Sequence, residues 1–245
     1  MTYCLAVKTN AGIVFASDSR TSAGVDNVNS YSKMYAFIQP GERCFVLLTA
    51  GNLATTQAVV NILQRDFANQ HAKRSLRTPD YMFDVAEYVG ELSCKMQARH
   101  AETTTTKKRN VDFSASFILG GQIGDAPQEI LMIYPEGNVI AASPANPYLQ
   151  IGETKYGKPI LDRIIAHDTS LEDAARCALV SIDSTMRSNI SVGPPIELRF
   201  YRADSLEIER HMTLDLESVL YDKLRRAWGD GLNRVFRELP PFEWE

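Results

Sequence analysis

The stretch Thr2–Arg20, TYCLAVKTNAGIVFASDSR, decides the fold that we expect for this chain. Two apolar runs, Tyr3–Val7 and Ile13–Ala16, flank a short segment, 10–12, that contains asparagine and glycine. These two residue types supply the backbone freedom that a hairpin turn needs. The pattern therefore predicts a β-hairpin at the N-terminal end of the given sequence.

Polar residues at the ends of this hairpin are candidates for chemistry. Thr2 opens the first run, Asp18 directly follows the second, and Arg20 comes two residues later. If Met1 is removed, Thr2 carries a free α-amine beside its own hydroxyl, and a base beside a hydroxyl can activate it as a nucleophile. Thr2 is therefore the candidate catalytic residue. Taken alone, these positions also fit ordinary strand-end residues.

Length and charge limit the classes of function. The 245 residues allow one large domain or two small ones, and the net charge is −4 with a pI of about 5.7. This acidic balance gives no reason to expect nucleic acid or an anionic membrane as a partner. The basic clusters at 71–77 and 107–109 are expected to be solvated surface. No stretch approaches the ~18 apolar residues of a membrane span, and no secretory signal is recognisable.

The cysteines and histidines carry no metal-ligand spacing. The four cysteines are far apart and lie in predicted strands or helices: Cys4, Cys44, Cys94 and Cys177. This spacing predicts buried free thiols rather than disulfides or zinc ligands. Together with the missing secretory signal, it indicates a cytoplasmic protein. We expect no metal and no cofactor, because the four histidines are scattered too.

The rest of the chain alternates between strands and helices. The polar segment Thr21–Ser32 predicts a long loop, and a second hairpin follows, with strands at Lys33–Ile38 and Cys44–Ala50. Helical spacing of apolar residues predicts five helices, from about Gly51 to Gln70, Thr78 to His100, Tyr156 to His167, Ser170 to the prolines at 194–195, and Asp215 to Phe236. The later strands are expected at Val111–Gly120, Glu129–Tyr134, Val139–Ala142, Ile196–Tyr201 and Glu207–Met212.

This order of elements predicts an α+β fold. Helix pairs between groups of hairpin strands favour two antiparallel sheets stacked face to face, with the helices outside. No internal repeat is present. We expect a single domain over residues 1–245, with a C-terminal helical extension from about residue 205.

Two positions in the second hairpin stand out. Lys33 opens its strand on the same face as Tyr35 and Phe37, an unusual neighbourhood for an ammonium group. Such a lysine either shields the edge of a hairpin or belongs to a site. The segment 49–51, Thr-Ala-Gly, turns the next strand into a helix. The Gly51 amide is thus expected near a helix N-terminus, where it could bind an anion or oxyanion.

Together these residues resemble the proteasome β-subunit family, which belongs to the N-terminal-nucleophile hydrolases and has an αββα sandwich. The resemblance rests on Thr2 after a lone Met, SDSR at 17–20, Lys33 at the start of a strand, and TAG at 49–51. It covers roughly residues 2–201, and the family's order of elements agrees with the order predicted above.

Within this family the chain is most similar to the bacterial Anbu branch, the ancestral β-subunits. The absence of a propeptide, the segment Ile151–Arg163 and the region after Asp204 carry that similarity. It implies a homo-oligomer that forms an open or spiral ring rather than a closed double ring. The tail, with Phe242 and Trp244, is a candidate contact between subunits or a loosely packed terminus.

The resemblance implies a threonine peptidase acting on peptides or unfolded proteins. The α-amine of Thr2 would be the base that activates its own hydroxyl. Lys33 would lower the pKa of both groups, and Asp18 would hold Lys33 in place. The Gly51 amide would stabilise the oxyanion.

The resemblance also implies supporting roles for nearby residues. Arg20 is expected to be structural, while Thr21 and Thr49 are expected to contact the substrate. Two positions depart from the family pattern: Glu153 follows Gly152 where a serine is usual, and Ser188 replaces an aspartate three residues before Ser191. Glu153 is the candidate to supply the missing charge.

Three functions stay open at this stage. The first is a threonine peptidase inside a self-assembled particle, and the second is an amidase acting on small substrates through the same nucleophile. The third is a non-catalytic assembly subunit, since a retained Met1 would block the amine. Whether an ATPase partner exists is left open.

Overall fold

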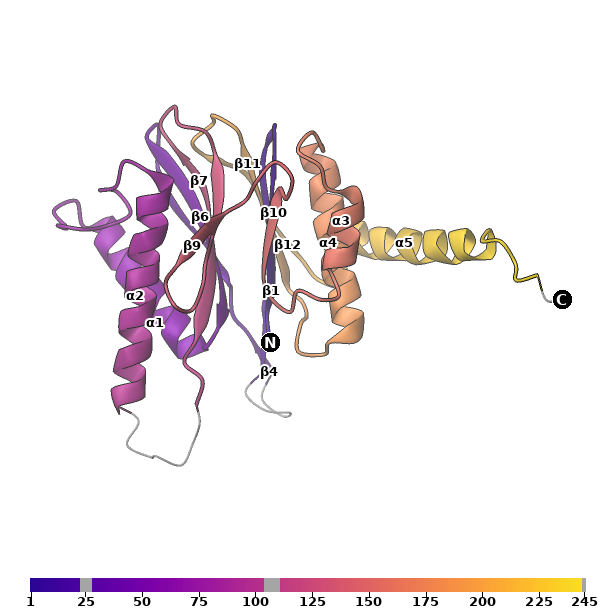
Figure 1. Cartoon of the computed structure of the whole chain (residues 1–245), viewed down its shortest axis with the longest axis horizontal. Helices are drawn as coiled ribbons and strands as arrows, with labels where there is room; N and C mark the ends of the chain where they lie inside the picture. The colour runs from indigo at the N-terminus through magenta and orange to yellow at the C-terminus, as the bar shows by residue number, and fades with distance from the viewer. Residues whose placement is uncertain (23–27, 104–110, 244–245) are drawn as a thin grey trace.

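The computed structural model describes residues 1–22, 28–103 and 111–243. Two antiparallel sheets lie face to face at its centre, and helices cover their outer faces (Figure 1). The predicted α+β fold with four layers, helices–sheet–sheet–helices, is confirmed. The basic cluster at 107–109 and the contact predicted for Trp244 lie outside the described residues.

The first sheet has five strands in the order β10-β1-β2-β11-β12. Their bounds are Tyr3–Thr9 for β1, Gly12–Asp18 for β2, Tyr148–Gly152 for β10, Ile196–Arg202 for β11 and Ile208–Leu214 for β12. The β1–β2 hairpin forms as predicted, with Cys4 opposite Ser17 and Thr9 opposite Gly12. Glycine is required in this turn because a Cβ at Gly12 would lie 2.0 Å from the carbonyl oxygen of Tyr201.

The second sheet also has five strands, in sequence order. They are β5 (Met34–Gln39), β6 (Arg43–Gly51), β7 (Ala115–Ile123), β8 (Glu129–Ile133) and β9 (Val139–Ala141). Apolar side chains from both sheets fill the space between them, including Phe15 from the first and Leu48 and Ile118 from the second. This layer brings the end of β2 close to the start of β5.

Two helices cover each outer face. Helices α1 (Leu53–Ala68) and α2 (Met82–Thr103) pack on the second sheet, and α3 (Lys158–Ile164) and α4 (Leu171–Ser188) pack on the first. Side-chain caps set two of the starts: Asn52 accepts from Thr55 N, and Ser170 accepts from Asp173 N.

Several predicted boundaries were wrong. Thr21–Ser32 is not one loop, because β3 (Arg20–Ser22) pairs with β4 (Val28–Ser30). Helix α2 starts at Met82 instead of Thr78, since the Thr78 hydroxyl donates to Ser75 O and closes a separate turn. Strand β7 starts at Ala115 instead of Val111, and α3 is shorter than predicted at both ends.

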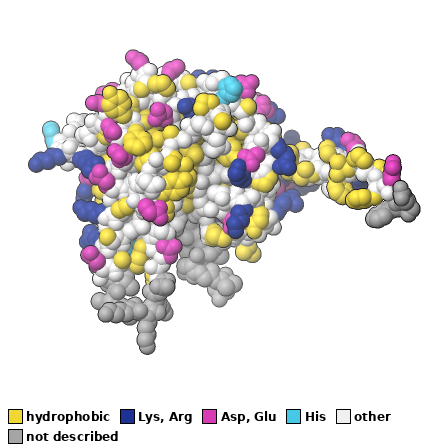
Figure 2. Space-filling view, viewed as in Figure 1, with side chains coloured by type: hydrophobic (Ala, Val, Ile, Leu, Met, Phe, Trp, Pro, Cys, Tyr) yellow, Lys and Arg dark blue, Asp and Glu magenta, His cyan; other side chains and the backbone are white. Residues whose placement is uncertain are grey.

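The last helix, α5 (Val219–Arg237), projects away from the sandwich (Figure 1). Its first turn is fixed to α4: Tyr221 is fully buried, and Arg225 lies 3.3 Å from the buried carboxylate of Asp183. Beyond this root, large apolar side chains are exposed, as Figure 2 shows for the projecting arm. They are Leu232, Val235, Phe236, Leu239 and Phe242. Among the described residues, no helix is long and apolar enough to cross a membrane.

Candidate active site

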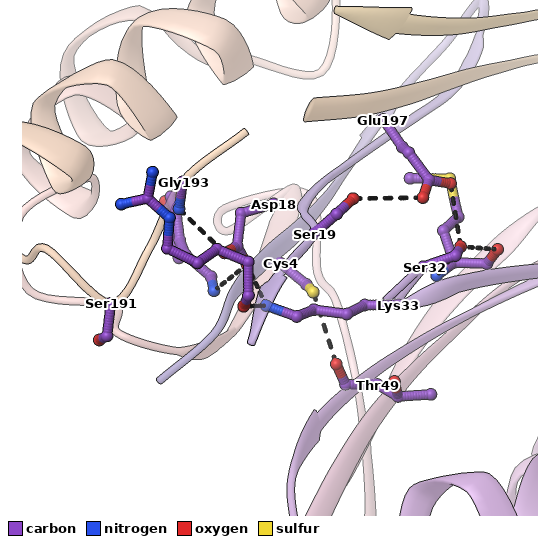
Figure 3. A network of polar contacts seen from close by, with 12 residues as sticks. Cys4, Asp18, Ser19, Ser32, Lys33, Thr49, Ser191, Gly193 and Glu197 are labelled. Carbon is purple, nitrogen blue, oxygen red and sulfur yellow. Dashed lines mark hydrogen bonds and ion pairs between the residues drawn. The ribbon is translucent and has the colours of Figure 1, made fainter. Parts of the chain in front are cut away.

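The end of β2 and the start of β5 bring a carboxylate and an ammonium group together. Lys33 Nζ lies 2.7 Å from Asp18 Oδ1, and the two groups come from different sheets (Figure 3). Asp18 is fully buried and Lys33 is only 5% exposed. Lys33 is therefore buried in an ion pair and does not shield a strand edge.

Three backbone groups also form hydrogen bonds with this pair. Asp18 also accepts hydrogen bonds from Tyr3 N at 2.9 Å and Gly193 N at 3.1 Å. Burial raises the pKa of Asp18, while Lys33 and the two N–H donors oppose that shift. Lys33 Nζ donates a second hydrogen bond to Arg20 O at 2.7 Å. The ammonium group is thus held in place by an anion and a carbonyl.

The first residues of the chain lie beside this pair. Tyr3 N binds Asp18, and Thr2 O accepts from Glu153 N at 2.7 Å. The terminal amine, here on Met1, has a pKa below its usual value because of burial and then the nearby Lys33 charge; Asp18 and Glu153 oppose the shift. A base at this end of the chain is therefore more often neutral than an ordinary terminal amine.

Gly51 ends β6 in a conformation that favours glycine, with φ +106°. A Cβ there would lie 2.4 Å from Ser114 O. Along the strand, N–H groups alternate between neighbours. Thr49 N donates to Lys33 O and Asn52 N donates to Ser114 O. Because Gly51 is two positions after Thr49, this alternation predicts that the Gly51 N–H lies on the same side of β6 as Thr49 N, the side of Lys33.

Glu153 is buried next to Thr2 and takes part in a short chain of hydrogen bonds. Its Oε2 accepts from Asn189 Nδ2 at 3.0 Å, and Asn189 Oδ1 accepts from Ser191 Oγ at 2.6 Å and from Ser191 N. Glu153 and Ser191, predicted as supporting residues, are thus connected through Asn189. Ser188, also predicted as a supporting residue, is exposed at the last position of α4 and lies outside these hydrogen bonds.

Asn189 was missed at the sequence level. Its signal was its position between Ser188 and Ser191, because asparagine commonly accepts a backbone hydrogen bond two residues on, as it does here from Ser191 N. The contact with Glu153, which is 36 residues away, has no signal in the local pattern.

The remaining predicted residues have structural contacts. The Arg20 guanidinium packs against Gly193, where a Cβ would lie 2.3 Å from Arg20 Cζ, and donates to Ile190 O at 2.8 Å. Thr21 is half-buried in β3. Thr49 is buried, and its N–H binds Lys33 O while its carbonyl accepts from Cys4 Sγ at 3.6 Å. These contacts favour a role for Thr49 in holding the start of β5 rather than in pairing with substrate.

Within the described ranges, no three histidine, cysteine or carboxylate side chains gather as a metal site. All four cysteines are free thiols, and three of them are buried: Cys4, Cys44 and Cys177. Burial raises the pKa of Cys44 to about 12, so its thiol is protonated at neutral pH.

Comparisons with known proteins agree with the fold described above. A family model described as Proteasome subunit matches residues 2–199. A proteasome β-subunit of Haloquadratum walsbyi is 25% identical over 211 residues, 86% of this chain and 77% of that protein. The solved structure of Anbu (ancestral β-subunit) from Yersinia bercovieri is 41% identical, with a TM-score of 0.92, and covers 99% of this chain and all of that one. A structure described as the helical assembly of the Anbu complex from Pseudomonas aeruginosa is 44% identical, with a TM-score of 0.92 over 98% of each chain.

Proposed function

The chain belongs to the proteasome subunit family, and from this premise we propose that it is a threonine-type peptidase subunit whose nucleophile is Thr2. One observation carries the proposal: a buried ammonium group, Lys33 Nζ, is held 2.7 Å from Asp18 beside the start of the chain. A buried cation is costly unless it is paired, and here it is paired with Asp18, whose carboxylate also binds Tyr3 N directly after Thr2. Such an arrangement suits activation of a weak nucleophile.

The proposed reaction begins once removal of Met1 has freed the Thr2 amine. The Thr2 hydroxyl attacks the carbonyl carbon of a peptide bond, and the neutral amine accepts the hydroxyl proton. The amine then donates that proton to the leaving nitrogen as the C–N bond breaks, which leaves an ester on Thr2. Water attacks the ester, the amine again takes and returns a proton, and the carboxylic acid departs.

Charges around the amine and the carbonyl oxygen favour each step. At the Met1 amine, burial and Lys33 favour the neutral form while Asp18 and Glu153 oppose it. In this proposal the same groups act on the Thr2 amine once Met1 is removed. We assign the Gly51 N–H to the developing oxyanion, because it falls on the Lys33 side of β6. In this proposal Asn189 and Ser191 hold the Glu153 carboxylate next to Thr2, and Thr21 contacts the substrate backbone.

We also propose that the subunit assembles with copies of itself into an open or spiral ring. The Pseudomonas relative is described as a helical assembly. In this chain α5 projects from the sandwich with apolar side chains exposed, including Val235 at 53% and Phe236 at 75%. An apolar groove of about 1310 Å³ lies between the root of α5, α4 and β11, away from the Lys33–Asp18 pair. A second copy would cover these surfaces.

The expected partners are peptides or unfolded proteins in the cytoplasm, with neither nucleic acid nor membrane. The acidic net charge of −4 gives no reason to expect nucleic acid or an anionic membrane as a partner, and free thiols fit a reducing compartment. An ATPase partner has no support from the surfaces described above.

Intact mass spectrometry followed by covalent capture tests the proposed nucleophile. We expect a chain that lacks Met1 and that reacts once with an electrophile requiring both a hydroxyl and a neighbouring amine. Thr2→Ala should not react, while Thr9→Ala, which changes a buried threonine at the far end of β1, should react like the parent chain. A chain that keeps Met1 and does not react would point to the non-catalytic assembly subunit.

Turnover of a peptide library separates the peptidase from the amidase. Cleavage of unstructured peptides of eight or more residues, at roughly the rate of shorter ones, supports the peptidase. Cleavage confined to small amides, with covalent capture intact, would support the amidase and overturn the peptidase.

A further inference from the structure

We propose that Glu197 is a positioning residue that fixes the geometry of the Asp18–Lys33 pair by binding one hydroxyl on each side of it. Its carboxylate accepts from Ser19 Oγ at 3.3 Å and from Ser32 Oγ at 3.1 Å (Figure 3). Ser19 directly follows Asp18, and Ser32 directly precedes Lys33. The catalytic meaning of this contact rests on the proposed function, but the contact itself can be tested without it.

The pair needs such a connection because its members belong to different sheets. Asp18 ends β2 in the first sheet, and Lys33 stands just before β5 in the second. Among the described residues no strand ladder joins these two five-stranded sheets, so their relative position depends on side-chain packing and on local contacts. The segments that carry Ser19 and Ser32 are joined by the short β3–β4 ladder, with Arg20 opposite Ser30, and by the backbone hydrogen bond from Tyr31 N to Ser19 O at 2.9 Å. Glu197 adds a side-chain connection between them.

Glu197 is well placed to connect these segments. It lies in β11, directly opposite Ser17 of β2 and one position from Ile196, which is opposite Asp18. Its side chain is only 8% exposed, so its negative charge lies where an unpaired carboxylate is costly. Each carboxylate oxygen accepts from a different serine. Both acceptors are therefore used, one for each segment.

Other charged and titratable groups face Glu197 without replacing the serines. His211 Nε2 is 3.7 Å from Glu197 Oε2 and is largely exposed. Arg199 and Tyr35 are also within electrostatic reach of the Glu197 charge. Neither His211 nor Arg199 lies in the segments that carry Asp18 and Lys33. Loss of the serine contacts would leave Glu197 charged but no longer joined to those segments.

The two short contacts of the Lys33 ammonium group depend on how Ser19 and Ser32 are held relative to each other. Lys33 Nζ reaches Asp18 Oδ1 and Arg20 O, both at 2.7 Å, and these acceptors lie on either side of Ser19 in the chain. A shift of the Ser32 segment relative to Ser19 would lengthen both contacts at once. Glu197 opposes that shift, because it holds Ser19 and Ser32 with the two oxygens of one rigid group.

Acylation of lysines by an amine-reactive ester, read by mass spectrometry on the full chain, tests the contact without any need for turnover. In the parent chain Lys33 is expected to be protected, and the largely exposed Lys158 serves as the internal reference. In Glu197→Ala we expect Lys33 to be acylated about tenfold faster, because two hydrogen bonds to a charged acceptor are lost. Ser32→Ala removes an exposed hydroxyl and should give a smaller increase, which keeps the test available if Glu197→Ala does not fold.

Two further variants serve as matched controls. Glu197→Gln keeps the shape and a hydrogen-bonding oxygen for one serine, with an amide that can donate to the other, so Lys33 should remain protected. Glu209→Ala removes an exposed carboxylate of the neighbouring strand, which pairs with Arg202, and should leave the acylation rate of Lys33 unchanged. Unchanged protection of Lys33 in both Glu197→Ala and Ser32→Ala would overturn the proposal, as would equal exposure in Glu197→Gln and Glu197→Ala.

Turnover then tests the catalytic meaning separately. Glu197→Ala should lower kcat by about tenfold with KM little changed, and Glu197→Gln should restore most of kcat. If Lys33 becomes exposed while the parent chain itself shows no turnover, the proposed function fails and the positioning contact stands. If Lys33 becomes exposed and kcat does not fall, Glu197 holds the pair but the pair does not limit the rate, and the catalytic part of the inference is overturned.

Discussion

The buried Asp18–Lys33 pair between the sheets and the projecting helix α5 are opposite kinds of region, because the first is polar and buried and the second is apolar and exposed. The buried Asp18 carboxylate has three partners within the chain, namely Lys33, Tyr3 N and Gly193 N. Beyond the root of α5, large apolar side chains such as Val235 and Phe236 are exposed to solvent. The first region is complete in one copy of the chain, and the second gains stability only when another surface covers it.

This contrast separates what a single subunit can do from what an assembly must add. A polar site that is fully satisfied within the chain is rigid, and changes to it should alter chemistry and stability inside the subunit. Changes to the apolar side chains of α5, which extends from the body, should alter association between subunits and leave the fold of the subunit intact. Five variants test this distinction.

The largest effect is expected from removal of the buried cation. Lys33→Met should lower turnover by about 10²–10³-fold, as loss of one preorganised charge does. It should also destabilise the subunit by about 3–5 kcal/mol, because Asp18 is left buried with a charge and no cation. Urea unfolding and peptide turnover measure the two effects.

A double variant separates charge from packing at the same place. Lys33→Met combined with Asp18→Asn should regain most of the lost stability and none of the activity, since the neutral pair no longer buries an isolated charge. Equal stability of Lys33→Met and the parent chain would contradict a tightly coupled pair.

The next effect concerns the arm. Val235→Asp with Phe236→Asp should raise the dissociation constant of the assembly by about 100-fold or more, because two charges enter an apolar contact. Sedimentation velocity measures the mass, and thermal unfolding of the subunit should not change. Asn233→Asp, an exposed polar position of the same helix, is the control. An unchanged mass in the double aspartate variant would show that α5 is not the contact.

A smaller effect is expected where β6 ends. Gly51→Ala should cost about 1–3 kcal/mol, because its φ of +106° disfavours a side chain and a Cβ would meet Ser114 O at 2.4 Å. Gly41→Ala is the matched control, since its φ of +73° is also positive but no atom lies within 4 Å of the added Cβ. Denaturant midpoints compare the two, and an equal loss would mean that the close approach to Ser114 is unimportant.

The smallest effect is a displacement of the pH profile. Burial and Lys33 lower the pKa of the Met1 amine, while Asp18 and Glu153 oppose them, and we expect the same directions for the Thr2 amine after removal of Met1. A lowered pKa makes the neutral base available at lower pH, so turnover should rise with pH and reach its plateau below the range typical of terminal amines. Glu153→Gln removes the opposing charge, lowers the pKa of the amine further and moves the rising limb to lower pH.

The control for that variant keeps the charge. Glu153→Asp should leave the rising limb of the pH profile close to its original position. An unchanged rising limb in Glu153→Gln would show that the Glu153 charge does not affect the pKa of the amine. The measurement is kcat/KM for one peptide across pH 5 to about 9, with the assembly state checked at each end, a range that brackets the usual amine pKa.

Local signals were sufficient for much of the fold. The β1–β2 hairpin, its Gly12 turn and the helix caps at Asn52 and Ser170 follow from residues that interact within a few positions of each other. Strands β3 and β4 were missed because they are short and polar, so they carry no apolar alternation. The start of α2 was placed too early because Thr78 and Pro79 resemble a helix start, yet Thr78 turns back to Ser75.

By itself, the sequence determined the elements and the residue types available for chemistry, including Thr2, Asp18 and Lys33. Only the tertiary structure decided that Asp18 and Lys33 meet in a buried pair, that Asn189 reaches Glu153, and that Glu197 binds Ser19 and Ser32. The physical reason is separation along the chain. Glu197 is 178 residues from Ser19 and 165 from Ser32, and a hydrogen bond over such a distance depends on how two sheets pack rather than on any local preference.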